Sequence, residues 1–126
     1  TSAAWSAHLE RLLDSCYDDD TPRAATLAWR PAIETAPDFE AVEVHRVTRA
    51  PHTATADQVV DWLLSISVVS KREASRKAEI KAAAAAILAE AAASAGGSET
   101  VVVDADGTVR FAMPMYVDVC TAVRRR

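Results

Sequence analysis

Glycine is missing from the first three quarters of this chain. The 126-residue sequence has only three glycines, and the first of them is Gly96. Loops that hold a nucleotide or a pyrophosphate use glycine, because a Cβ would keep the backbone away from the ligand. We therefore expect no phosphate-cradling loop before Gly96, and no cofactor-binding residue of that kind in this chain.

Length, charge and cysteine content further restrict the class of protein to which this chain can belong. We expect one domain over residues 1–126, which is long enough to bury a core. The formal charge of −4 argues against a nucleic-acid partner. No apolar run reaches the ~18–20 residues that cross a bilayer, so we expect no membrane span. Cys16 and Cys120 are predicted to be buried thiols in a reducing cytoplasm. The start at Thr1, without a signal peptide or an initiator methionine, indicates a processed or truncated form.

Apolar residues at helical spacing predict about four helices. The first spans Ser2 to Cys16, and the second opens at Thr21 and Pro22, with a kink or restart at Pro31. The last two begin at capping boxes, where a hydroxyl and a side chain three residues later satisfy backbone donors reciprocally. Those boxes are Thr55 with Gln58 and Ser70 with Glu73; the latter opens a long helix over 71–95 that ends at Gly96-Gly97.

Alternating and β-branched residues predict the strands. The first covers 39–47 and ends before Pro51. Residues 100–103 and 108–113 form a hairpin with Gly107 in the left-handed conformation. Pro114 is expected to interrupt the ladder before a further strand over 115–123. Together these elements predict an α+β fold, in which the helices pack on a small, mainly antiparallel sheet.

Four residues are candidates for a site that contacts a small-molecule substrate: His52, Trp62, Ser65 and Tyr116. His52 is expected between a strand end and a helix start, where binding residues often lie, and its imidazole titrates near neutral pH. It is the one weak candidate for a catalytic group. Trp62 and Tyr116 suit either a pocket wall or packing in the core. Ser65 lacks a base beside it, so capping of a helix end is its alternative role. The three histidines show no metal-ligand spacing, so no metal is expected.

The order of features from Trp5 to Arg124 resembles the C-terminal region of class I S-adenosylmethionine-dependent methyltransferases of the small-molecule type. An aromatic-led helix resembles 5–13, a proline-led helix with tryptophan resembles 22–33, and the sixth strand of that family resembles 39–44. A turn with histidine and threonine, like 52–55, and a helix ending in Ser-x-Ser, like 65–67, follow. A long helix and a last strand with a basic end complete the pattern. Val68 stands where the family often has an aromatic residue, and the hairpin over 101–111 is extra.

This resemblance implies the substrate-side portion of a methyltransferase and the C-terminal strands of its Rossmann-like fold. The glycine-rich loop and the acidic residue that hold S-adenosylmethionine lie upstream in the family and have no counterpart here. The chain is then not expected to bind that cofactor, or to be catalytic, unless it is joined to the missing half. Because an open strand edge at 117–123 recruits another strand, we expect a homodimer or a pairing with the cofactor-binding half. The alternative is a stand-alone, non-catalytic α+β module for binding or dimerisation.

Overall fold

The computed structural model describes residues 4–18, 21, 29–94 and 100–126. Its residue contacts divide the chain into two compact units. We call the first the helical unit (residues 1–17 and 51–113) and the second the ribbon unit (residues 18–50 and 114–126). Two strands, β1 (Phe39–Ala54) and β3 (Val109–Arg124), belong to both units.

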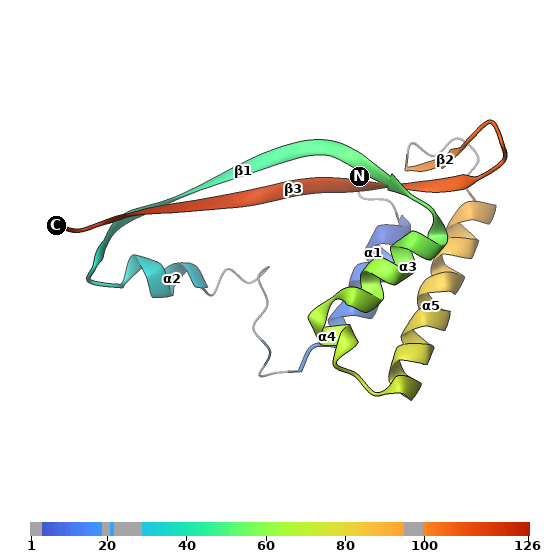
Figure 1. The fold of residues 1–126 in the computed structure, drawn as a ribbon, viewed down its shortest axis with the longest axis horizontal. Coiled ribbons are helices and arrows are strands. Elements are labelled where there is room, and N and C mark those ends of the chain that lie inside the picture. Colours follow the sequence, from blue (N-terminus) through green and yellow to red (C-terminus); the bar gives the residue numbers. More distant parts are fainter. Residues whose placement is uncertain (1–3, 19–20, 22–28, 95–99) are drawn as a thin grey trace. The chain divides into compact units, whose positions relative to one another are not determined.

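The fold is α+β. The helical unit contains α1 (Ala4–Asp14), α3 (Ala56–Ser65), the single turn α4 (Ser67–Ser70) and the long α5 (Ala74–Ala93). Figure 1 shows α1 and α3 lying beside α5. The ribbon unit contains α2 (Trp29–Glu34). The sheet of the described residues has three strands in the order β1-β3-β2, with β2 (Val101–Val103) antiparallel to β3.

The core of the described residues lies in the helical unit, and its side chains are apolar. Trp5 packs edge-on against Phe111, with ring centroids 5.3 Å apart. Its indole N–H donates to the hydroxyl of Thr100 at 3.3 Å, which satisfies the polar atom of a buried ring. Helix α5 contributes a stripe at four-residue spacing, as the sequence predicts. The buried members of that stripe are Ile80, Ala84 and Leu88.

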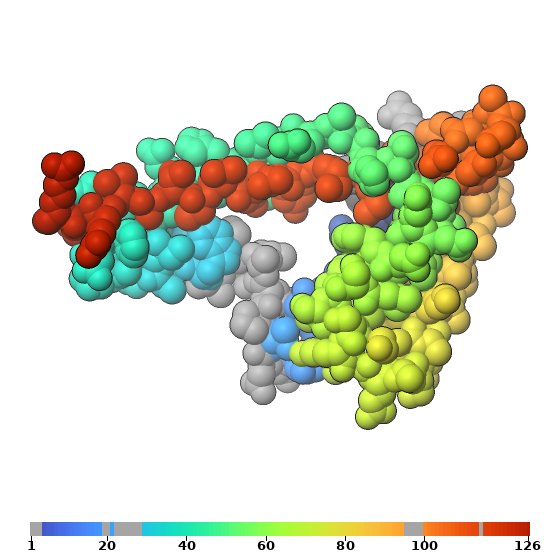
Figure 2. All heavy atoms as spheres, viewed as in Figure 1, coloured from blue at the N-terminus to red at the C-terminus, as the bar shows by residue number. Residues whose placement is uncertain are grey.

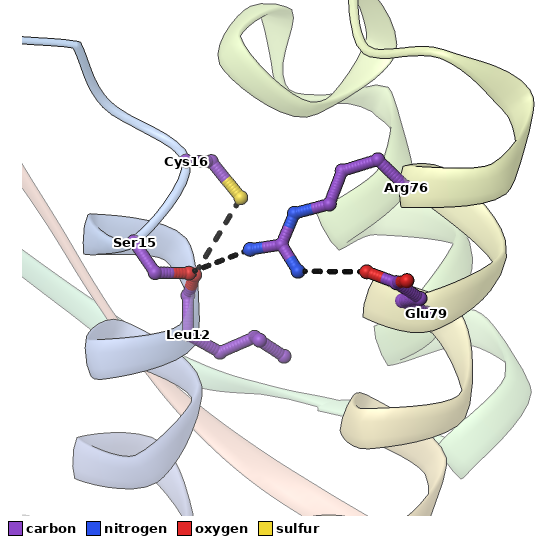
Figure 3. A network of polar contacts seen from close by, with 5 residues as sticks. All are labelled: Leu12, Ser15, Cys16, Arg76 and Glu79. Carbon is purple, nitrogen blue, oxygen red and sulfur yellow. Dashed lines mark hydrogen bonds and ion pairs between the residues drawn. The ribbon is translucent and has the colours of Figure 1, made fainter.

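Polar contacts fasten the C-terminal end of α1 to α5 (Figure 3). Arg76 of α5 donates to the Ser15 hydroxyl at 3.2 Å and pairs with Glu79 at 3.2 Å. Arg72 donates to the backbone carbonyls of Val68 and Cys16. Ser15 and Cys16 directly follow α1, so these contacts join the end of that helix to α5 and to the residues just before it.

Two local predictions are confirmed. Thr55 caps α3: its hydroxyl accepts from the N–H of Gln58 at 3.3 Å, and the Gln58 side chain accepts from the N–H of Thr55 at 3.0 Å. The β2–β3 hairpin forms with Val101 opposite Phe111, and Gly107 has φ +85°. Both features depend on residues within a few positions of each other.

The second capping box is wrong. Ser70 is the last residue of α4, and its N–H donates to Ile66 at 2.8 Å. An N-cap has an extended backbone, and the residue with that conformation before α5 is Glu73 (φ −62°, ψ 155°). The Glu73 side chain makes no capping hydrogen bond. Helix α5 therefore starts at Ala74.

Both predicted proline breaks in the strands are wrong as well. Strand β1 continues through Pro51 to Ala54, and β3 continues through Pro114 to Arg124. Strand β1 stands at the end of the strand order, and an edge strand tolerates a proline because one side of it needs no ladder hydrogen bond. Proline is also tolerated in α2, where Pro31 lies among the first residues, whose N–H groups have no partner in a helix.

Some expectations fall outside the described residues. These are the cap at Ser2, the helix start at Pro22 and the stop at Gly96-Gly97. Cys16 is buried as expected, whereas Cys120 is exposed, because no described element covers its part of β3. Neither cysteine forms a disulfide. Within the described ranges, no helix combines the length and the apolar character that a membrane crossing requires.

Candidate interaction site on the ribbon unit

The ribbon unit exposes its apolar side chains. Strands β1 and β3 form its two-stranded ribbon, and α2 accompanies one end of it (Figure 1). Its residues are all exposed or half-buried where the structure describes their burial, whereas the buried residues that it describes belong to the helical unit. The large apolar residues of β3 in this unit are 42% to 63% exposed; they are Met115, Tyr116, Val117, Val119 and Val123. A two-stranded ribbon is only marginally stable in water by itself, and exposed apolar patches often mark interaction sites. We therefore interpret the exposed apolar side chains of this unit as a candidate interaction surface.

A cluster of three side chains joins the two strands. The Arg46 guanidinium donates to both carboxylate oxygens of Asp118, at 2.8 and 2.9 Å. The same guanidinium lies 4.0 Å from the centre of the Tyr116 ring, a distance at which a cation is attracted to the ring face. The Arg46 hydrogen bond lowers the pKa of Asp118, and Asp118 in turn raises the pKa of Arg46. The cluster fixes the lateral pairing of β1 and β3.

This cluster also defines the faces of the ribbon. Because successive side chains of a strand point to opposite faces, Tyr116, Asp118 and Cys120 share the face of Arg46. Val42 and Val44 are half-buried on that face. The other face carries Val47 from β1 and the row Met115, Val117, Val119 and Val123 from β3. Apolar side chains therefore occupy both faces of β3.

One edge of β3 is open. Strand β2 covers only its beginning, where Ala112 donates to the carbonyl of Thr100 at 2.8 Å. On the other side, the N–H of Arg125 donates to the carbonyl of Asp38 at 2.7 Å, just before the start of β1. No described strand lies on the β2 side of β3 beyond Ala112. Since backbone groups alternate between the two sides of a strand, Pro114 turns its nitrogen to this open side, where no hydrogen bond is lost.

Of the four candidate residues from the sequence, Trp62 and Ser65 lie on α3, His52 lies on β1, and Tyr116 lies on β3 in the ribbon unit. His52 is exposed on β1 and not in a loop, since β1 extends to Ala54. Trp62 is exposed on α3, and the Ser65 hydroxyl donates to the carbonyl of Trp62 at 2.6 Å, which is the capping role considered for it. Tyr116 is exposed in the ribbon unit, under Arg46.

Sequence reasoning missed Arg46 and Asp118 as partners. Alternation along a strand indicates which of its residues share a face, but it gives no register between two strands. No group of three or more metal-ligating side chains is found among the described residues. Comparison of the chain with protein-family models gives no match, and comparisons with curated proteins and with solved structures give no significant match.

Proposed function

We propose that this chain is the substrate-side, C-terminal portion of an S-adenosylmethionine-dependent methyltransferase. It becomes catalytic only when it is joined to a half that binds the cofactor. The observation that supports this proposal is the exposure of apolar side chains on both faces of β3, beside an open edge. Strands that are apolar on both faces are typical of sheets covered by helices on both sides.

In this proposal elements of the cofactor-binding half cover the faces of the ribbon, where Val117, Val119 and Val123 are exposed here. From the helical unit, His52, Trp62 and Ser65 are the residues proposed to contact the small-molecule substrate. The scarcity of glycine assigns S-adenosylmethionine to the other half, because the backbone before Gly96 offers no position without a Cβ.

Calorimetry with S-adenosylmethionine tests the proposal on two proteins. The first is this chain, which we expect to give no binding heat at cofactor concentrations up to the millimolar range. The second is the polypeptide encoded by the longest reading frame that contains this chain, which we expect to carry a glycine-rich loop upstream and to bind the cofactor. Binding by the isolated chain contradicts the proposal, and so does a longest reading frame whose product binds no cofactor.

A second candidate is a stand-alone module for binding or dimerisation, without chemistry. The absence of buried polar or charged residues among the described positions favours it. Catalytic groups usually lie where burial and neighbouring charges shift their pKa. The groups whose pKa their neighbours shift in this structure, Arg46, Asp106 and Asp118, are instead exposed. The calorimetric test separates the candidates, since this one predicts no cofactor binding by either protein.

A further inference from the structure

We propose that two copies of this chain associate through the open edges of β3. The two β3 strands run antiparallel about a two-fold axis that passes between the two copies of Thr121. In this register Asp118 lies opposite the second copy's Arg124, and Val119 lies opposite the second copy's Val123. Each of these pairs occurs twice by symmetry. The inference requires the open edge of β3 and does not rest on the proposed function.

The backbone groups available for this pairing follow from the alternation along β3. The N–H of Arg125 faces β1, so the backbone groups of the even-numbered residues face the open edge. The contact of Ala112 with Thr100 on the β2 side agrees with this assignment. The unpaired row consists of Tyr116, Asp118, Cys120, Ala122 and Arg124. Pro114, which has no N–H to donate, lies before this row.

The alternation restricts the registers that two such edges can adopt. Even-numbered residues must face even-numbered residues, so the axis moves along the strand in steps of one residue. With Cys120 on the axis, Asp118 faces Ala122 and no opposite charges meet. With Ala122 on the axis, Asp118 faces Arg126, but Val119 faces Arg125. The register centred on Thr121 brings together opposite charges on one face and valines on the other.

The charge pattern of the edge suits this arrangement. Asp118 lies near one end of the row, and Arg124 to Arg126 lie at the other end. Antiparallel association brings the acidic position of one copy against the basic end of the other. Asp118 already accepts both Arg46 hydrogen bonds, and each carboxylate oxygen has a second acceptor site for a further guanidinium. Two short edges of the same sequence therefore complement each other.

Disulfide trapping tests the register in the Cys120→Ala background. Thr121→Cys is expected to form a disulfide-linked dimer on air oxidation, because directly opposite residues of a non-hydrogen-bonded pair bring their Cβ atoms close together. Val117→Cys is the matched control: it lies on the same face of β3, but in this register it lies opposite the second copy's Arg125. Cys16 remains in both variants and is buried. Equal trapping of both variants, or preferential trapping of the Val117→Cys variant, overturns the proposal.

Sedimentation of the unmodified chain at tens of micromolar supplies the second test. A dimer has twice the 13.5 kDa mass of one chain. Arg124→Asp places like charges opposite each other at two symmetric positions and is expected to weaken the dimer roughly tenfold. Arg126→Asp is the control, because Arg126 faces Tyr116 in this register and not a carboxylate. A monomer at these concentrations, or an equal loss from both variants, contradicts the proposal. Neither measurement involves a cofactor, so a negative result leaves the methyltransferase proposal untouched.

Discussion

Arg46 and Asp118 stand 72 positions apart in the sequence, and two hydrogen bonds of 2.8 and 2.9 Å join their side chains. The pair links parts of β1 and β3 where most side chains are exposed. Exposed ion pairs contribute little to stability by themselves, but a bidentate guanidinium–carboxylate contact is geometrically specific. We therefore assign Arg46 and Asp118 the role of fixing the strand register, and we place the interaction surface on β3 beside them.

The ion pair predicts a pH dependence with a defined sign. Because Arg46 lowers the pKa of Asp118 in the folded chain, the contribution of the pair is present at neutral pH. It is lost as the pH falls through the depressed pKa of Asp118. We expect NMR titration to show Asp118 losing its charge at lower pH in the native protein than in Arg46→Gln. Arg49→Gln, on the opposite face of the same strand, is the control; an equal shift in both variants contradicts this assignment.

The cap of α3 predicts that Thr55 contributes more to the unfolding free energy than Ser70 does. Thr55→Ala removes the hydroxyl that accepts from Gln58 and is expected to cost about 1 kcal/mol of unfolding free energy. Ser70→Ala should cost clearly less, because Ser70 does not cap α5. Urea unfolding followed by circular dichroism measures both changes. A larger loss at Ser70 than at Thr55 would show that the capping box predicted at Ser70 is real.

The hairpin turn predicts that substitutions of Gly107 lower stability through the backbone conformation alone. Gly107 has φ +85°, and no heavy atom lies within 4 Å of the position that a Cβ would occupy. Gly107→Ala is therefore expected to cost about 1–2 kcal/mol through the left-handed backbone and not through a clash. Gly107→Asn should cost less, since asparagine tolerates this conformation. Equal losses in thermal unfolding of the two variants are the result that would refute this explanation.

The buried stripe of α5 predicts that truncating Leu88 and truncating its neighbour Ile87 will cost different amounts of unfolding free energy. Leu88 is fully buried, and Leu88→Ala is expected to cost about 2–5 kcal/mol of unfolding free energy, because it leaves a cavity. Ile87 is only half-buried, so Ile87→Ala should cost less. Chemical denaturation of both variants checks the order. The reverse order would mean that α5 turns a different face to the core.

The predictions from sequence that hold concern residues close to each other in the chain. The Thr55 cap spans three residues, and the turn at Gly107 closes between Asp104 and Thr108. The fold class follows in the same way, since helical and alternating spacing reflect the geometry of single elements. The α5 stripe needs only the period of a helix.

The failures concern residues whose conformation depends on distant partners. Pro51 is tolerated because β1 is an edge strand, and Pro114 is tolerated because its nitrogen faces the open side of β3. The residues next to each proline in the sequence indicate neither of these positions. Cys120 has an apolar setting in the sequence, yet it is exposed. Ser70 fits the sequence pattern of an N-cap, but it is the last residue of the helical turn α4 and therefore does not cap α5.

The sequence by itself determined the type and approximate extent of the helices, the turn at Gly107 and the absence of glycine before Gly96. Those features depend on local backbone preferences, which act over a few residues. Tertiary structure alone decided that Arg46 meets Asp118 and that the apolar residues of β3 stay exposed while the helical unit closes its core. The register of β1 and β3 depends on a contact between residues 72 positions apart in the sequence. A local sequence pattern does not indicate which residues of two distant strands lie opposite each other.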